Sequence, residues 1–239
     1  MNIAVIGTGN VGVVVGTGFA ENGHRVSCVD KSDDRIRALS EGALPIHEPG
    51  LKELVARNIE EERLRFTTDL NGALGDCLIV FVCVDTPRGP DGEADLSQIF
   101  SAAEGIGDAL TDYAVVVMKS TCPVGTAERV EETLKERAPC AFDVVVNPEF
   151  MTEGNAVDDF MRPDRVVIGC NDVRIIEIIK ELYAPFLRSG KPLLIMDPRS
   201  AELSKYAAAP PSAPASRLST KSRTSPKPMA PISTMCGRR

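Results

Sequence analysis

The sequence lacks three features that each mark a particular class of protein: a CxxC cysteine pair, an apolar run of membrane-spanning length and a charged amino-terminal leader. Its cysteines are odd in number and several fall within apolar segments. We therefore expect reduced thiols in the core, with no disulfide framework, no zinc site and no metal ligands. The cysteines are Cys28, Cys77, Cys83, Cys122, Cys140, Cys170 and Cys236.

No stretch of the 239 residues is apolar over the roughly 20 residues that a membrane helix needs. The amino terminus enters an apolar strand directly, without a charged leader or a cleavage site. These absences predict a soluble, cytoplasmic protein without a membrane partner. The hydrophobic content of 43% is sufficient for a packed core.

Residues 209–239 differ in composition from the body of the chain. From position 207 to the end the sequence holds six prolines, six serines and six of the 27 basic residues, but none of the 34 acidic residues. A polar, proline-rich segment without apolar periodicity is typical of disorder, so we expect a disordered, low-complexity tail. The remaining body is strongly acidic, which argues against nucleic acid as a partner.

At the amino terminus, a short apolar strand at 2–6 is followed by three glycines, Gly7, Gly9 and Gly12. Their spacing is that of a dinucleotide-binding turn. The first glycine makes a tight turn, the second lets the backbone approach a pyrophosphate, and the third lets helix and strand pack closely. The helix that starts near Val11 would offer N–H groups and its positive dipole end to the phosphates. We therefore predict a dinucleotide site here.

The second predicted strand, at 25–30, ends at Asp30. A carboxylate at this position accepts hydrogen bonds from the ribose hydroxyls and repels a 2′-phosphate, so NAD is favoured over NADP as the cofactor. Arg35 lies just beyond the strand and could instead hold a 2′-phosphate. With Asp30 in place, we expect Arg35 to lie over the adenine or ribose. The alternative interpretation is a fold of the same kind that binds no dinucleotide.

Buried strands and amphipathic helices alternate along the rest of the body. This alternation is typical of an α/β protein with a doubly wound parallel sheet, the Rossmann fold. We expect one domain at 1–196, followed by the start of a further helix at 197–208. Ser32 is expected to cap the second helix. The predicted strands cover 2–6, 25–30, 64–67, 78–84, 114–119, 143–147, 165–169 and 193–196. The helices predicted after the first one cover 33–41, 51–63, 96–109, 126–137 and 173–186.

Polar side chains follow three of these strands. In a doubly wound sheet the ligand lies beyond the carboxyl ends of the strands, so these side chains should line the site. Glu149 and Glu153 could lie on a solvated loop face, but two acids on this rim are at least as well explained by a role in proton transfer. Thr86, Thr121 and Thr126 could form turns or cap helices, which we expect for Thr126. The three segments are 84–87, 119–126 and 147–154.

Six motifs stand in series in the sequence: Gly7-Thr-Gly-Asn-Val-Gly12, Glu48-Pro-Gly-Leu51, Ser120-Thr-Cys-Pro-Val-Gly-Thr126, Asn147-Pro-Glu-Phe150, Arg162-Pro-Asp-Arg165 and Ser200-Ala-Glu-Leu-Ser-Lys-Tyr206. In this order they resemble the nucleotide-sugar dehydrogenases, the UDP-glucose/GDP-mannose dehydrogenase family. The resemblance is continuous from Met1 to about Ala208 and is most marked for members that oxidise UDP-glucose. Members that act on GDP-mannose or UDP-N-acetylmannosamine share the architecture, so these two substrates remain alternatives.

The resemblance implies that the C6 alcohol of UDP-glucose is oxidised to a carboxylate with two NAD. It implies further that Glu149 acts as an acid or base, that Lys205 stabilises an oxyanion at C6, and that Thr121 takes part in catalysis. The residues that it places at the substrate are Glu149, Phe150, Met151, Glu153 and Lys205. Those that it places at the cofactor are Gly7, Gly9, Asn10, Val11, Gly12, Asp30, Arg35, Thr86, Thr121 and Glu153.

The sequence departs from the family pattern after position 208. Ala209 stands where the pattern has an asparagine. The sequence contains no match to the long central helix through which the family forms homo-oligomers, to the second domain or to the catalytic cysteine, and Cys236 lacks the context of that nucleophile. We therefore expect that this chain as written cannot complete the oxidation. The alternative is a stand-alone module that binds NAD without turnover.

A shift of one base near 209–211 would account for these departures. Read in the shifted frame, the segment from Leu218 to Ser225 can encode Phe-Val-Asn-Glu-Ile-Ala-Asn-Leu. Residues 227–239 can encode a further family-like string, and together these have the helical periodicity of the family's central helix. We therefore predict that 209–239 is an out-of-frame segment.

Overall fold

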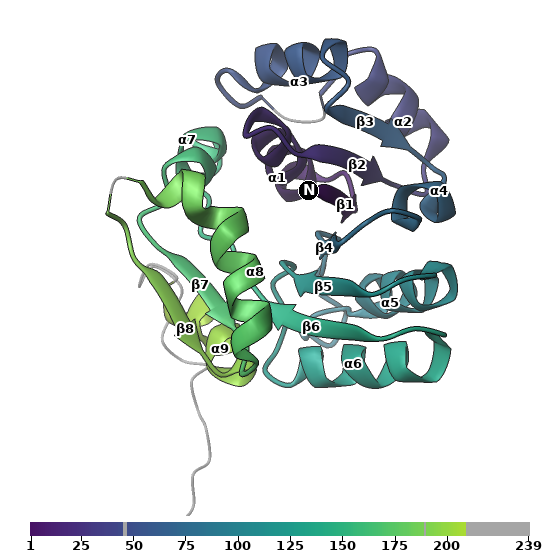
Figure 1. Cartoon of the computed structure of the whole chain (residues 1–239), viewed down its shortest axis with the longest axis vertical. Coiled ribbons are helices and arrows are strands. Elements are labelled where there is room, and N and C mark those ends of the chain that lie inside the picture. The colour runs from purple at the N-terminus through teal and green to yellow at the C-terminus, as the bar shows by residue number, and fades with distance from the viewer. Residues whose placement is uncertain (45–46, 189, 209–239) are drawn as a thin grey trace, which may run out of the picture. The chain divides into compact units, whose positions relative to one another are not determined.

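A computed structural model of the chain describes residues 1–44, 47–188 and 190–208 (Figure 1). The predicted tail at 209–239 and its proposed change of reading frame lie outside the described residues. Within the described ranges, no helix combines the length and the apolar character needed to cross a membrane.

The described residues form one sheet of eight strands with the order β3-β2-β1-β4-β5-β6-β7-β8. Strands β1 to β6 are parallel, and β1 pairs with both β2 and β4, so the chain changes direction across the sheet at β1. This confirms the predicted doubly wound fold and puts a ligand crevice at the carboxyl end of β1. The strands are β1 (Asn2–Ile6), β2 (Arg25–Val29), β3 (Leu64–Thr67), β4 (Ile79–Val82), β5 (Ala114–Met118), β6 (Phe142–Val146), β7 (Val166–Gly169) and β8 (Leu193–Met196).

The last two strands run against the other six, which the strand pattern did not predict. Strand β7 pairs with β6 antiparallel, through Val146 and Gly169, and β8 is parallel to β7. Because these two residues are the last of their strands, the rest of β7 extends past the carboxyl end of β6. Strands β7 and β8, with α7, α8 and α9, therefore form a wall at the edge where β5 and β6 end (Figure 1).

Helices cover both faces of the sheet, as a doubly wound fold requires. Ser32 caps α2 by accepting a hydrogen bond from the backbone N–H of Arg35, as predicted. The predicted helix at 173–186 ends earlier, because Pro185 lies in a following 3₁₀ turn. The short helices α4 and α7 were not predicted. The helices are α1 (Asn10–Glu21), α2 (Asp33–Ser40), α3 (Leu51–Glu60), α4 (Leu70–Leu74), α5 (Ser97–Ala109), α6 (Thr126–Arg137), α7 (Ala156–Met161), α8 (Val173–Tyr183), the turn η1 (Ala184–Leu187) and α9 (Pro198–Ala207).

The core has two layers, one on each face of the sheet. Buried side chains of α1, α3, α7 and α8 pack on one face, and those of α4, α5, α6 and α9 pack on the other. Phe19 of α1 is the centre of the first layer: its ring stacks on Phe81 and meets the edges of Phe160, Tyr183 and Phe186. These aromatic contacts connect α7, α8 and η1 to α1 on the parallel part of the sheet.

Candidate functional site

The glycine turn between β1 and α1 has the sterics that its spacing predicts. Gly7 adopts a left-handed backbone, with φ of 97°, and a Cβ atom there would lie 2.6 Å from the carbonyl oxygen of Cys83. A Cβ atom at Gly12 would lie 1.9 Å from the carbonyl oxygen of Gly7, so only glycine lets α1 pack on the turn. At Gly9 the nearest atom to an added Cβ is an Asp85 carboxylate oxygen at 3.4 Å, an ordinary contact.

The amino end of α1 begins at Gly9, which has no side chain to cap it. Among the residues that the structure describes, no side chain accepts a hydrogen bond from the first turn, which begins with Asn10 and Val11. Exposed N–H groups at a helix start, beside a backbone with no side chain, suit an anionic phosphate. The chain therefore fits the pyrophosphate of a dinucleotide at this turn.

Asp30 is held by four hydrogen bonds from three residues. Its carboxylate accepts from the N–H and hydroxyl of Thr8 at 3.0 and 2.9 Å, from the N–H of Ser32 at 3.1 Å and from Arg35 at 3.3 Å. Burial by itself raises the pKa of Asp30, but the bonds from Thr8 and Ser32 and the Arg35 guanidinium outweigh it and lower the pKa. An ionised carboxylate is thus fixed at the end of β2. Thr8, which is fully buried, was not predicted as a site residue.

A cavity of about 480 Å³ opens beside this carboxylate, and we call it the glycine-turn cavity. It lies where β1, β2 and β4 end, which is the crevice expected of a doubly wound sheet. Two of the predicted glycines and both predicted ribose-side residues line it. Its lining includes Gly7, Gly9, Asp30, Arg35, Asp85 and Ser101.

Two of the predicted threonines lie on neighbouring loops that touch. The hydroxyl of Thr86, after β4, donates to the carbonyl oxygen of Thr121, after β5, at 2.7 Å. The hydroxyl of Thr126 donates to the carbonyl oxygen of Pro123 at 2.6 Å, which confirms its predicted role in a turn. The polar segments after β4 and β5 are therefore hydrogen-bonded to each other.

Glu149 and Lys205 are 56 positions apart and form an ion pair. The Lys205 ammonium donates to one carboxylate oxygen of Glu149 at 2.5 Å and to its carbonyl oxygen at 2.7 Å. The other carboxylate oxygen accepts from the N–H of Met151 at 2.6 Å. The Lys205 nitrogen lies 5.7 Å from the ring centre of Phe150, on whose ring Arg165 stacks at 4.2 Å. The structure thus brings together four of the five predicted substrate residues.

Glu153, the fifth, is exposed on the same loop. Within the described part of the chain its side chain makes no hydrogen bond or ion pair, so it is not joined to the Glu149–Lys205 pair. The structure gives it no defined position toward a cofactor.

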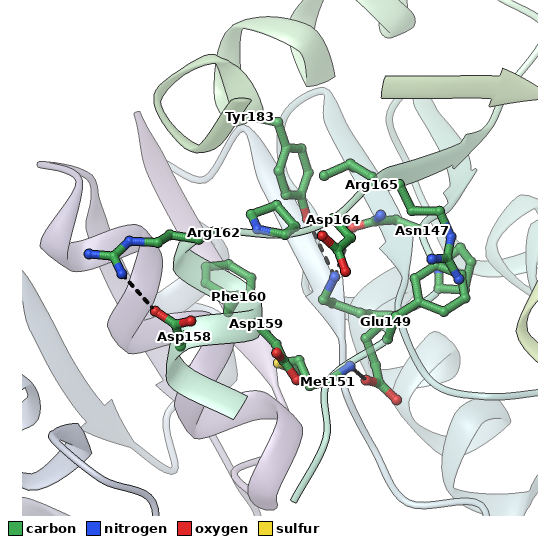
Figure 2. Close-up of a pocket in the computed structure, with 15 residues that line it drawn as sticks. Asn147, Glu149, Met151, Asp158, Asp159, Phe160, Arg162, Asp164, Arg165 and Tyr183 are labelled. Carbon is green, nitrogen blue, oxygen red and sulfur yellow. Dashed lines mark hydrogen bonds and ion pairs between the residues drawn. The ribbon is translucent and has the colours of Figure 1, made fainter. Parts of the chain in front are cut away.

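A buried lysine, Lys119, lies behind this loop and was missed by the sequence reasoning. It is 4% exposed and donates to the side-chain oxygen of Asn147 at 3.0 Å, and Tyr183 donates to the same oxygen at 2.5 Å. Burial lowers the pKa of Lys119 to about 8. The only available signal was a charged residue directly after the fully buried strand β5. These residues line a cavity of about 230 Å³. Figure 2 shows side chains that line it, with Glu149 and Met151 hydrogen-bonded to each other.

Two buried glutamates hold the loops that carry the site. Glu48 accepts from the N–H groups of Gly154 and Ala156 at 2.7 and 2.9 Å, at the start of α7. Glu202 of α9 accepts from two N–H groups at the start of α6. Both belong to motifs that the sequence singled out, but their spacing did not say what they bind.

The described cysteines are free thiols, and all of them except Cys140 are buried. Burial raises the pKa of Cys83 and of Cys122 to about 12, so at neutral pH these thiols are protonated and poor nucleophiles. Among the described residues there is no cluster of three or more His, Cys, Asp or Glu side chains that could hold a metal ion.

Residues 1–187 match the family model described as the UDP-glucose/GDP-mannose dehydrogenase family, NAD binding domain. The UDP-glucose 6-dehydrogenase of Pseudomonas aeruginosa is 48% identical over 213 residues, which are 87% of this chain and 47% of that protein. The corresponding protein of Rhizobium meliloti is 48% identical over 211 residues, which are 87% of this chain and 48% of that protein. The chain thus spans about half the length of the curated relatives it matches.

Solved structures give the same result. A UDP-glucose dehydrogenase from Pyrobaculum islandicum aligns with a TM-score of 0.81 and 40% identity, covering 86% of this chain and 48% of that one. A GDP-mannose dehydrogenase from Pseudomonas aeruginosa aligns with a TM-score of 0.80 and 32% identity, covering 87% and 49%. The similarity therefore extends to family members that carry different nucleotide sugars in their names.

Proposed function

The chain belongs to the UDP-glucose/GDP-mannose dehydrogenase family, and from this membership we propose that it binds NAD and takes part in the oxidation of UDP-glucose at C6. The whole reaction of the proposal converts UDP-glucose, two NAD and water to UDP-glucuronate and two NADH. The observation that carries the chemistry is the pair of Lys205 and Glu149, which stands at the edge of the sheet where β6 ends.

In this proposal the glycine turn and the start of α1 hold the cofactor pyrophosphate, and the ionised Asp30 accepts hydrogen bonds from the ribose hydroxyls. Arg35 forms an ion pair with Asp30. This pairing favours a position of the Arg35 guanidinium beside the ribose. The nicotinamide end would meet Thr86, Thr121 and Glu153. The full set proposed for the cofactor is Gly7, Gly9, Asn10, Val11, Gly12, Asp30, Arg35, Thr86, Thr121 and Glu153.

NAD, when bound, supplies the hydride acceptor. The side chains accept the proton and stabilise the negative charge. One carboxylate oxygen of Glu149 is bound by Lys205 and the other by a backbone N–H, so the group is held in one orientation and can take the proton of the alcohol. The Lys205 ammonium has three donors and uses two on Glu149. The third has no partner among the described residues and would stabilise negative charge at the C6 oxygen.

We propose that the described part of the chain cannot by itself carry the aldehyde on to the acid. The family resemblance implies that this step uses a thiolate, which forms a covalent intermediate with the aldehyde. The described thiols beside the site loops, Cys83 and Cys122, have raised pKa values and are buried. A binding module without turnover is thus the second candidate function, favoured by this observation. We propose that family members form homo-oligomers through their central helix. Such a helix would follow position 208, outside the described residues.

Incubating the purified chain with NAD and UDP-glucose tests the proposal, with NADH followed by absorbance and the sugar products by mass spectrometry. We expect NAD binding, at most a trace of aldehyde, and no UDP-glucuronate. Lys205→Met should abolish any NADH formation and leave NAD affinity unchanged. UDP-glucuronate formed by the wild-type chain would refute the argument from the thiols.

Parallel incubations with GDP-mannose and UDP-N-acetylmannosamine test the sugar specificity. If either of these sugar nucleotides forms NADH faster than UDP-glucose does, it replaces UDP-glucose as the proposed substrate. NAD binding with no NADH from any of the three would support the binding module.

A further inference from the structure

Helix α9 carries two charged side chains on one face, Glu202 and Lys205, one turn apart. Glu202 is 3% exposed, whereas the Lys205 side chain is 24% exposed and reaches Glu149. A carboxylate buried this deeply must be fully hydrogen-bonded to be tolerated. Its partners therefore fix the position of the helix that carries it.

Those partners lie at the start of α6, 77 and 75 positions earlier in the chain. One carboxylate oxygen of Glu202 accepts from the N–H of Gly125 at 2.6 Å, and the other accepts from the N–H of Ala127 at 2.8 Å. Gly125 is the cap residue of α6 and has a left-handed backbone, with φ of 92°, and no side chain. Glu202 thus supplies from α9 the cap that α6 lacks.

The loop just before α6 is the one that carries Thr121, whose carbonyl oxygen also accepts the hydroxyl of Thr86. Glu202 therefore joins two parts of the proposed site: this loop on one side and the helix of Lys205 on the other. We propose that Glu202 is a positioning residue, which holds α9 against the start of α6 at the place where Lys205 reaches Glu149. The catalytic meaning of this position rests on the proposed function.

Other contacts keep α9 packed when Glu202 is changed. Ala201 is fully buried against Gly169, where a Cβ atom would lie 2.6 Å from the Ala201 methyl group. Arg199 makes a two-pronged ion pair with Glu128 of α6, at 2.7 Å for each bond, and both side chains are exposed. Loss of the Glu202 cap should therefore let α9 shift relative to the start of α6 without unfolding it.

The test is competitive labelling of lysine amines with a trace of acetic anhydride, with each lysine quantified by peptide mass spectrometry in the full 239-residue chain. Glu202→Gln keeps the size of the side chain but leaves one acceptor oxygen, so one N–H at the start of α6 loses its bond. We expect labelling of Lys205, relative to the exposed Lys135, to rise on the order of tenfold as its bonds to Glu149 are lost. Glu149→Gln, which removes the negative charge of the side-chain partner, sets the scale for Lys205 without its ion pair.

Glu128→Gln is the matched control, because it breaks the other polar contact between the same two helices. It should leave the labelling of Lys205 at the wild-type level. If Glu202→Gln also labels at that level while its circular dichroism is native, the proposal is wrong. If Lys205 labelling rises as much in Glu128→Gln as in Glu202→Gln, the proposal is also overturned, because any loosening of α9 would then release Lys205.

Glu202→Asp serves if Glu202→Gln does not fold. Its carboxylate is one methylene shorter and cannot reach both N–H groups, so Lys205 labelling should lie between the wild type and Glu149→Gln. Wild-type labelling in a folded Glu202→Asp would contradict the proposal. The measurement uses neither NAD nor a sugar nucleotide, so its outcome is separate from the success or failure of the proposed function.

Discussion

Gly9 and Gly12 belong to one turn but differ in what surrounds them. At Gly12 an added methyl group would overlap the carbonyl oxygen of Gly7, whereas at Gly9 it would make only an ordinary contact. We predict that Gly12→Ala lowers the stability of the fold by about 1–3 kcal/mol or more, as overpacking does. Gly9→Ala should fold normally and bind NAD at least tenfold more weakly, by about 1.4 kcal/mol, because its methyl group occupies the path of the pyrophosphate.

Thermal unfolding and calorimetric titration with NAD measure the two effects separately. Gly75→Ala is the matched control, because Gly75 has a helical backbone, its added Cβ would lie 3.7 Å from the nearest atom, and it lies outside the glycine-turn cavity. It should change neither quantity. Wild-type NAD affinity in Gly9→Ala would contradict the pyrophosphate assignment.

The lowered pKa of Asp30 makes its contribution to stability depend on pH. Folding favours the ionised form, so the contribution is fully present above the unfolded-state pKa of about 4 and is lost as the pH falls through the lower folded-state pKa. We predict that Asp30→Asn costs about 1–3 kcal/mol at neutral pH, because its bonds to charged and backbone donors are weakened. The cost should shrink toward about pH 3 in urea unfolding curves. A cost that does not change with pH would show that Asp30 is not ionised in the fold.

Single residues were predictable where a local motif dictates the chemistry. The glycine turn, Asp30 and Thr126 follow from sequence spacing. Glu149 and Lys205 were each predicted from the resemblance, but their ion pair was not. Lys119 and Thr8 could not be predicted, because their importance comes from burial and from partners far away in the chain. The one local signal, the charge of Lys119 directly after the buried strand β5, does not indicate its partners.

At the scale of elements, the loop from β6 to α7 is held at both ends by buried polar groups. Asn147 is held at its start by Lys119 and Tyr183, and Glu48 holds its end at Gly154 and Ala156. The loop between them carries Glu149. This explains the Glu48-Pro-Gly-Leu51 motif as a structural link to the site.

We predict that Glu48→Gln lowers the free energy of unfolding by about 1–3 kcal/mol, because one buried N–H loses its acceptor. Amide hydrogen exchange should speed up at 153–156 more than elsewhere. Glu53→Gln on the exposed face of α3 is the control and should change neither. Unchanged exchange at 153–156 in Glu48→Gln would remove Glu48 from this role.

Apolar patterning was enough to predict the eight strands and the main helices but not the direction of the last two strands. A buried strand such as β7 has the same pattern whichever way it runs. The short helix α7 in the link after β6 packs on α1, and the chain re-enters the sheet from the end at which it left. That contact between segments distant in sequence decides the direction, and no local pattern encodes it.

At the scale of the whole molecule, the chain matches about half the length of its relatives, and residues 209–239 lie outside the described part. The predicted frame change there stays a prediction. Resequencing the codons for 209–211 should reveal a missing base and restore a family-like frame. A confirmed frame, with a stop codon in the shifted frame before any motif for the catalytic cysteine, would contradict it.

Above all, we propose that this fold binds NAD through the glycine turn and selects it through Asp30. Calorimetric titration of the purified chain with NAD and with NADP tests the claim most directly, and Asp30→Ala should lose most of the discrimination. We expect NAD to bind at least about tenfold more tightly than NADP, a difference of about 1.4 kcal/mol. Equal or tighter binding of NADP by the wild-type chain would contradict it.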